Sequence, residues 1–143
     1  MKEFFDSSVF VSAFWNGHAS HAASLKLLSR ATRKKSFCAL HSLAEVYATM
    51  TALPVRDVIP PEQALLFIEA IRERCTLVSL DESDYARVLQ QVAEKGFTSG
   101  RIHDALLLRC AAKVKADLIY TWNLKHFRAI DSSLAAKVRS PLA

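Results

Sequence analysis

The segment FFDSSVFVSAF, residues 4–14, sets one acid, Asp6, inside a run of mostly apolar residues. No other charged residue lies between Phe4 and Ala23. Residues 2–6 are predicted to form a short strand, and Ser7 or Ser8 can then begin a helix. Because an unpaired carboxylate costs several kcal/mol to bury, Asp6 is expected either to cap a helix or to meet a cation.

The rest of the chain alternates between helix-like and strand-like segments. Helical spacing, caps and stop signals predict helices over residues 18–34, 42–53, 60–74, 81–95 and 102–116. Strands are predicted over residues 36–40, 75–80 and 117–121. This alternation predicts an α/β fold with a mainly parallel sheet flanked by helices. Since no repeat or linker interrupts the pattern, we expect one domain over residues 1–143.

The composition is that of a compact globular chain with a basic surface. Of its 143 residues, 51% are apolar and 23% are charged. A chain of this length can remove roughly 70% of its unfolded surface from water, so it can form a full core. The formal net charge of +5 favours a polyanionic partner, either nucleic acid or an acidic protein.

The cysteines and the N-terminal residues indicate the compartment. Cys38, Cys75 and Cys110 are odd in number and lack CxxC spacing, which argues against disulfides and a zinc site. We expect buried free thiols in a reducing environment. Glu3 and Asp6 interrupt the N-terminal segment, and no apolar run approaches 18 residues. A cytoplasmic protein is therefore expected.

Glu45 is the only charged residue between Lys35 and Arg56. Two explanations are open for it. With Ser42 it matches the S-x-x-E capping box, in which the glutamate accepts a hydrogen bond from the serine backbone. It can also belong to an acidic site at the start of its helix, and the two roles can coexist.

Asp104 shares a helix face with Leu107, Leu108 and Ala111. An acid in a first helical turn gains from the helix dipole, which is its structural explanation. An acid on an apolar stripe also needs a partner, and a metal ion is the functional explanation. The residue pattern alone does not separate the two.

Asn123 follows the last predicted strand as Asp6 follows the first. A turn asparagine is the common reason for such a position, although a carboxamide can also bind a cation. In α/β folds, sites form beyond the carboxyl ends of the strands, which would bring Asp6, Glu45 and Asp104 together. Two carboxylates about 4 Å apart repel by roughly 4 kcal/mol at a dielectric constant of 20. Three oxygen ligands of this kind predict a site for Mg²⁺ or Mn²⁺.

Four segments occur in one order along the chain: FFDSSVFVSAF, HSLAEVYATMT, GRIHDALLLRCA and IYTWNLKHF. In this respect the sequence resembles PIN-domain proteins, most closely the VapC-type toxins of bacterial toxin–antitoxin pairs. The resemblance covers nearly the whole chain. It implies a PIN-like three-layer fold and a Mg²⁺- or Mn²⁺-dependent endoribonuclease that cleaves structured RNA, of the transfer RNA or ribosomal RNA class. It also implies a homodimer and a cognate antitoxin.

The resemblance places the family's acidic quartet on Asp6, Glu45, Asp104 and Asn123, with the three acids as metal ligands. Asn123 stands where the family often has an aspartate, a departure that bears on a second metal position. The hydroxyls at two further matching positions are implied to support the acidic cluster, namely Ser8 and Thr121.

Three basic residues flank the proposed site and are expected to contact RNA phosphates: Arg101, Lys125 and Arg128. His41, His103 and His126 have no triad pattern and are expected to be structural or surface residues. Two other classes of protein remain open. One is a catalytically silent module that binds RNA or an antitoxin. The other is a metal-dependent phosphatase, although Ser8 occupies the second place of the D-x-D pair that such enzymes need.

Overall fold

The computed structural model describes residues 1–142 and contains a five-stranded sheet with all neighbouring strands parallel. The strand order is β3-β2-β1-β4-β5. The strands are β1 (Glu3–Phe5), β2 (Ser36–Ala39), β3 (Thr76–Val78), β4 (Leu118–Tyr120) and β5 (Val138–Arg139). The predicted α/β class with a parallel sheet is confirmed, and β1 lies at its centre.

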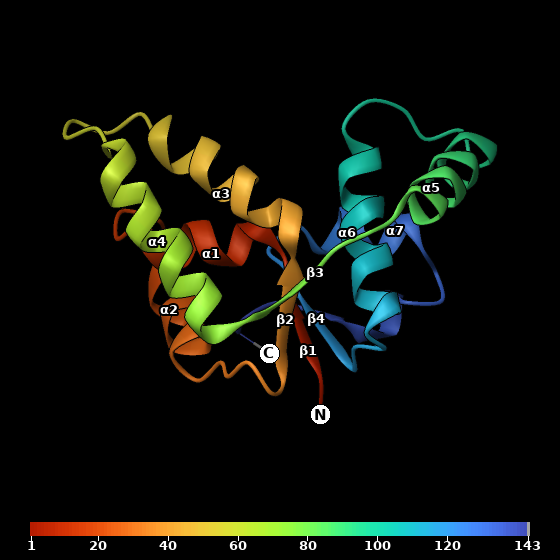
Figure 1. Cartoon of the computed structure of the whole chain (residues 1–143), viewed down its shortest axis with the longest axis horizontal. Coiled ribbons are helices and arrows are strands. Elements are labelled where there is room, and N and C mark those ends of the chain that lie inside the picture. The colour runs from red at the N-terminus through yellow and green to blue at the C-terminus, as the bar shows by residue number, and fades with distance from the viewer. Residues whose placement is uncertain (143) are drawn as a thin grey trace.

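Helices cover both faces of the sheet (Figure 1). On one face lie α1 (Ser7–Phe14), α2 (His21–Ser29), α3 (Leu40–Thr51) and α4 (Pro61–Arg74). On the other lie α5 (Glu82–Glu94), α6 (Arg101–Lys113) and α7 (Leu124–Ile130). A short 3-10 helix, Ala135–Lys137, leads into β5. None of the helices within residues 1–142 is long and apolar enough to cross a bilayer.

The two faces of β1 separate two hydrophobic cores. Successive strand residues point to opposite faces, so Phe4 packs with α5, α6 and α7 while Phe5 packs with α1 to α4. Both phenylalanines have no exposed surface. The predicted free thiols are confirmed: Cys38, Cys75 and Cys110 are buried and unbridged. Contact with the Cys75 thiol and burial hold the pKa of Cys38 well above its usual range.

Several element boundaries differ from the sequence predictions. The helix predicted over 18–34 is α2, His21–Ser29, because a turn occupies residues 16–20 and the chain leaves the helix at Arg30. The strand predicted over 75–80 is shorter, and α6 ends at Lys113 rather than 116. The predicted helix stop at Gly96 is confirmed by its φ of 72°. The helix α7 and the strand β5 were not predicted from the sequence.

The predicted capping box of Ser42 and Glu45 is wrong. The helix α3 begins two residues earlier than expected, at Leu40, and Ala39 is its N-cap without a side-chain bond. Ser42 therefore lies within the first turn, where it is buried. Its distance from the cap removes the geometry that the box requires, which leaves Glu45 free for other contacts.

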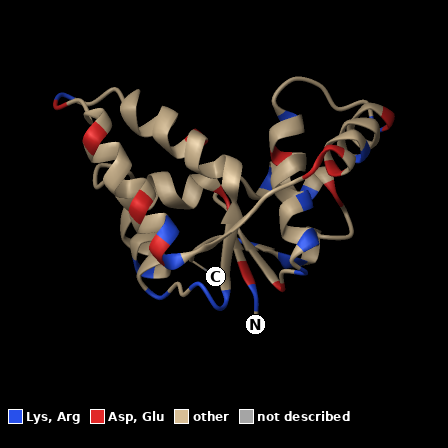
Figure 2. Cartoon of the chain, viewed as in Figure 1, with Lys and Arg blue, Asp and Glu red and all other residues tan. Residues whose placement is uncertain are grey.

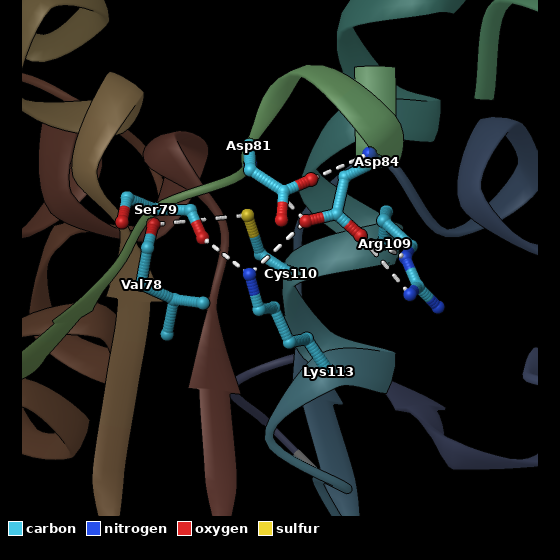
Figure 3. A network of polar contacts seen from close by, with 7 residues as sticks. All are labelled: Val78, Ser79, Asp81, Asp84, Arg109, Cys110 and Lys113. Carbon is cyan, nitrogen blue, oxygen red and sulfur yellow. Dashed lines mark hydrogen bonds and ion pairs between the residues drawn. The ribbon is translucent and has the colours of Figure 1, made fainter. Parts of the chain in front are cut away.

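A charged network joins α5 to α6 on the face opposite α1 (Figure 3). Asp84 accepts hydrogen bonds from Arg109 Nε and Lys113 Nζ, each at 3.0 Å. Its backbone N–H also donates to Asp81 Oδ1 at 2.8 Å, and Asp84 Oδ2 accepts from the Asp81 N–H in return, which caps α5. The hydrogen bond from Lys113 is the main reason why the pKa of Asp84 lies well below its usual value.

We expect Asp84→Asn to lower Tm by several degrees at neutral pH, while Glu82→Gln on the same helical turn changes it little. The wild-type advantage is fully present above the ordinary aspartate pKa of about 4 and is lost progressively as the pH falls from there through the depressed folded pKa, so the loss of Tm is expected to be smaller at pH 3 than at pH 7. Thermal melts of both variants at pH 3 and pH 7 check this. Equal melting losses at the two pH values would contradict it.

Candidate active site at the carboxyl ends of the strands

The predicted site residues occupy the carboxyl-terminal edge of the sheet, at the ends of central strands and the starts of helices (Figure 1). Asp6 follows β1 directly, and Thr121 follows β4, which pairs with β1. Glu45 lies in the second turn of α3, and Asp104 in the first turn of α6. Since parallel strands end together, the topology brings residues from four separate segments to one edge.

Asp6 is buried, with 4% of its surface exposed, and it is the N-cap of α1. Its Oδ2 accepts hydrogen bonds from the Ser8 hydroxyl at 2.7 Å and the Thr121 hydroxyl at 2.8 Å. Burial raises the pKa of Asp6 above its usual value, although these bonds lower it. Capping was one of the two predicted roles of Asp6, and the structure shows it.

Within residues 1–142 no side chain donates a hydrogen bond to the second carboxylate oxygen of Asp6, and the nearby Ser7 backbone N–H lowers the pKa of the group. No fully enclosed polar side-chain atom in the described part of the chain lacks a partner, so Oδ1 is not sealed in the core. The Ser8 and Thr121 hydroxyls thus fix the carboxylate through Oδ2 and leave Oδ1 for another group. Both hydroxyls therefore hold the Asp6 carboxylate in one orientation.

Glu45 is held by a residue that the sequence did not single out. The Ser7 hydroxyl donates to Glu45 Oε1 at 3.0 Å and lies 3.1 Å from the Ser42 hydroxyl. Because Ser7 is the first residue of α1, this bond connects the helix that follows Asp6 to the helix that carries Glu45. In the sequence, Ser7 is marked only by its position next to Asp6.

Asp104 is half-buried, and its pKa is raised to about 6. Burial is the largest cause, and the negative charges of Asp6 and Glu45 add to it. His126 and His103 act in the opposite direction. Asp6 and Glu45 are therefore near enough to raise the cost of ionising Asp104, which is the electrostatic situation that a cation relieves.

Asn123 begins α7 without a side-chain cap bond, and its backbone N–H donates to the Thr121 hydroxyl at 3.0 Å. Asn123 is exposed to solvent. Together with Ser7, Ser8, Glu45 and Trp122 it lines an open cleft of about 310 Å³. Polar and apolar side chains line this cleft in similar measure, and Glu45 is the one of the three predicted acids among them.

Within residues 1–142 no three His, Cys, Asp or Glu side chains lie close enough to coordinate one ion as they stand. The chemistry of the donors nevertheless fits a hard divalent cation, because Asp6, Glu45 and Asp104 offer only carboxylate oxygens. Mg²⁺ keeps several of its waters in protein sites, so it does not require three direct protein ligands. The free Oδ1 of Asp6 and the raised pKa of Asp104 are consistent with such a site.

The three basic residues predicted to contact RNA differ in their surroundings. Arg101 lies 4.2 Å over the ring of Phe97, and Arg128 donates to the Val138 carbonyl at 3.0 Å. Lys125 is exposed. A second group of basic residues, Arg33, Lys34 and Lys35, lies on the loop before β2. This loop is at the opposite end of the sheet (Figure 2). Lys125 is therefore the best placed of the three for a phosphate.

The structure also brings together histidines for which the sequence predicts no catalytic role. His41 on α3 and His103 on α6 are exposed, and their nearly parallel rings lie 6.3 Å apart between centroids. His103 and His126 are the residues whose charge favours ionised Asp104. They are surface residues, as expected, but their position beside the acids could only be found in the fold.

These observations define an α/β protein with a parallel sheet and an acidic site at its carboxyl edge. A sequence profile of the PIN domain matches residues 4–132. The chain therefore belongs to the PIN domain family, as the four motif segments suggested.

Solved structures share this fold at low sequence identity. The chain superimposes on VapC20 of Mycobacterium tuberculosis, described as a sarcin-ricin loop cleaving toxin, with a TM-score of 0.72 and 15% identity over 90% of this chain and 95% of that one. For VapBC-1 from nontypeable Haemophilus influenzae the TM-score is 0.67 and the sequence identity is 17%, over 100% of both chains. For VapBC2 from Rickettsia felis, bound to a promoter DNA fragment, the TM-score is 0.66 and the sequence identity is 18%, over 98% of both chains. A search of curated proteins finds no match by sequence.

Proposed function

We propose that this protein is a Mg²⁺- or Mn²⁺-dependent endoribonuclease and the toxin of a type II toxin–antitoxin pair. The observation that carries the proposal is the placement of Asp6, Glu45 and Asp104 at the carboxyl edge of the sheet, where the first two are near enough to raise the pKa of Asp104. The family membership and the VapC neighbours support the same activity. Structured RNA of the transfer RNA or ribosomal RNA class is the proposed substrate.

In this proposal Asp6 and Asp104 hold the metal ion directly, and Glu45 holds it directly or through water. A bound divalent ion lowers the pKa of a coordinated water and offsets charge on the scissile phosphate. Ser8 and Thr121 keep Asp6 oriented through Oδ2. Asn123, exposed at the cleft, offers an amide that can hold a water or a phosphate oxygen.

The chain also supplies a group for the attacking water. Glu45 is fixed through Oε1 by Ser7, while its other oxygen accepts no hydrogen bond from the described residues. It can therefore accept the proton of a water aligned opposite the leaving oxygen. In-line attack would form a phosphorus–oxygen bond to that water and break the bond to the 3′ oxygen. The proton of the water would pass to Glu45, and a solvent water would protonate the leaving oxygen, which gives 5′-phosphate and 3′-hydroxyl ends.

The partners follow from the same neighbours. Two of the similar structures are VapBC assemblies, which supports a cognate antitoxin that covers the site. A homodimer is supported by α3, whose exposed face carries large apolar side chains: Leu40 is 48% and Tyr47 is 36% exposed. Figure 2 shows how few charges this helix carries.

Incubation of the purified protein with total RNA and Mg²⁺ tests the activity. We expect discrete fragments with 5′-phosphate ends, and their loss when EDTA removes the ion. RNA that is retained by the protein but stays intact with Mg²⁺ or Mn²⁺ would replace the proposal with a silent binding module. RNA that is neither bound nor cut would remove RNA as the substrate.

Lys125→Ala is expected to weaken RNA binding about 3- to 10-fold and to reduce the slope of log K against log salt by roughly one, because one phosphate contact is lost. Lys34→Ala removes the same charge from the loop before β2 and is expected to leave the slope unchanged. Filter binding of catalytically inactive protein at several salt concentrations measures both. Equal slopes for the two variants would contradict a phosphate contact at Lys125.

A further inference from the structure

The side chain of Trp122 is hydrogen-bonded to two buried hydroxyls, one on α1 and one on α2. Its indole N–H lies 3.0 Å from Ser12 Oγ and 2.8 Å from Ser24 Oγ. These hydroxyls are themselves hydrogen-bonded at 2.6 Å, and neither serine has any exposed surface. The indole thus joins the segment after β4 to both α1 and α2.

The backbone of Trp122 belongs to the acidic site. Its N–H donates to the Ser8 hydroxyl at 3.1 Å, and that hydroxyl donates to Asp6 Oδ2. The residues on either side are Thr121, which also binds Asp6, and Asn123, whose N–H donates to Thr121. Trp122 therefore connects two sets of hydrogen bonds. Its indole binds the buried serine pair, and its backbone N–H binds the Ser8 hydroxyl that holds Asp6.

This anchoring is unusual within its surroundings. The core around α1 and α2 is built from apolar residues such as Phe10, Leu27 and Leu28. Ser12 and Ser24 lie fully buried in that core. Buried hydroxyls need partners, and the indole N–H reaches the pair from a segment about 100 residues later in the chain. A packing role alone would be served by an apolar pair and a phenylalanine.

We propose that Trp122 is a positioning residue: its indole, held by Ser12 and Ser24, fixes residues 121–123 so that Asn123 faces the cleft and Thr121 and Ser8 hold Asp6. This inference rests on the proposed nuclease activity for its kinetic consequence, but the fixed segment itself can be measured without RNA. Partners that orient metal-binding groups typically contribute 10- to 100-fold to activity or metal affinity.

Trp122→Phe removes the N–H and keeps an aromatic ring. It is expected to lower kcat about 10- to 100-fold with little change in KM. In an Asn123→Ala background the same substitution is expected to lower kcat less, since one of the groups that it positions is gone while the hydroxyls that hold Asp6 remain. Ser24→Ala, which leaves Ser12 as acceptor, is expected to give a smaller loss. Trp15→Phe is the matched control, because Trp15 packs in the same core without contact to the acids.

Amide hydrogen exchange over residues 121–123 is a second measurement, and it does not depend on catalysis. Faster exchange in Trp122→Phe than in Trp15→Phe, measured below the melting temperature of both, supports the proposal. Equal exchange, a wild-type kcat, or the same loss of kcat with and without Asn123 overturns it. If wild-type protein cuts no RNA, the nuclease proposal fails, while exchange still decides whether Trp122 fixes the segment.

Discussion

Asp6→Asn is expected to abolish metal-dependent RNA cleavage, with a loss of about 1,000-fold or more in kcat/KM, which is about 4 kcal/mol of transition-state stabilisation. The substitution keeps the shape of the side chain. Asparagine is also a good N-cap, so α1 retains its start and the fold is preserved. The loss comes from the anionic oxygen that faces away from Ser8 and Thr121. Single-turnover cleavage of an RNA substrate with Mg²⁺ measures it.

The matched control is Asp57→Asn, an exposed aspartate in the loop between α3 and α4. It changes the net charge equally and is expected to cut RNA at the wild-type rate. Mn²⁺ titration gives a second readout: the ion should raise Tm of Asp57→Asn and not of Asp6→Asn. Full activity or an unchanged Mn²⁺ response in Asp6→Asn would remove Asp6 from the metal site.

Asp104→Asn is expected to abolish cleavage and yet to stabilise the metal-free protein. The pKa of Asp104 is raised to about 6, so its ionised form is disfavoured in the folded state. Stability that the wild type has below pH 4 is therefore lost as the pH rises from about 4 to about 6. Removing the charge avoids this loss, which amounts to about 1–2 kcal/mol above pH 6 once screening by solvent is allowed for.

Chemical denaturation of both proteins in EDTA at pH 4 and pH 7 measures this difference. We expect near-equal stabilities at pH 4 and a more stable variant at pH 7. Saturating Mn²⁺ should reverse the order, because only the wild type gains binding energy. Wild-type cleavage should likewise rise with pH through an inflection near or below pH 6. A variant that is less stable at pH 7 would show that Asp104 has a structural partner instead.

The sequence predicted the parallel α/β fold because apolar periodicity and turn residues are local signals. Asp6 and Asp104 were found in the same way, since each is an acid among apolar neighbours. Glu45 was ambiguous for a local reason: the start of α3 at Leu40 depends on how β2 runs into the helix. A shift of two residues was enough to remove the capping box and leave Glu45 to Ser7.

The charged residues that lie among apolar neighbours, and the order of strands and helices, can be read from the sequence. The contacts of those residues depend on the fold. Ser7 with Glu45, His41 with His103, and Trp122 with Ser24 are pairs from distant segments. Hydrogen bonds and shifts in pKa depend on distances of a few ångströms in space, and spacing along a chain does not fix such distances until the sheet brings its strand ends together.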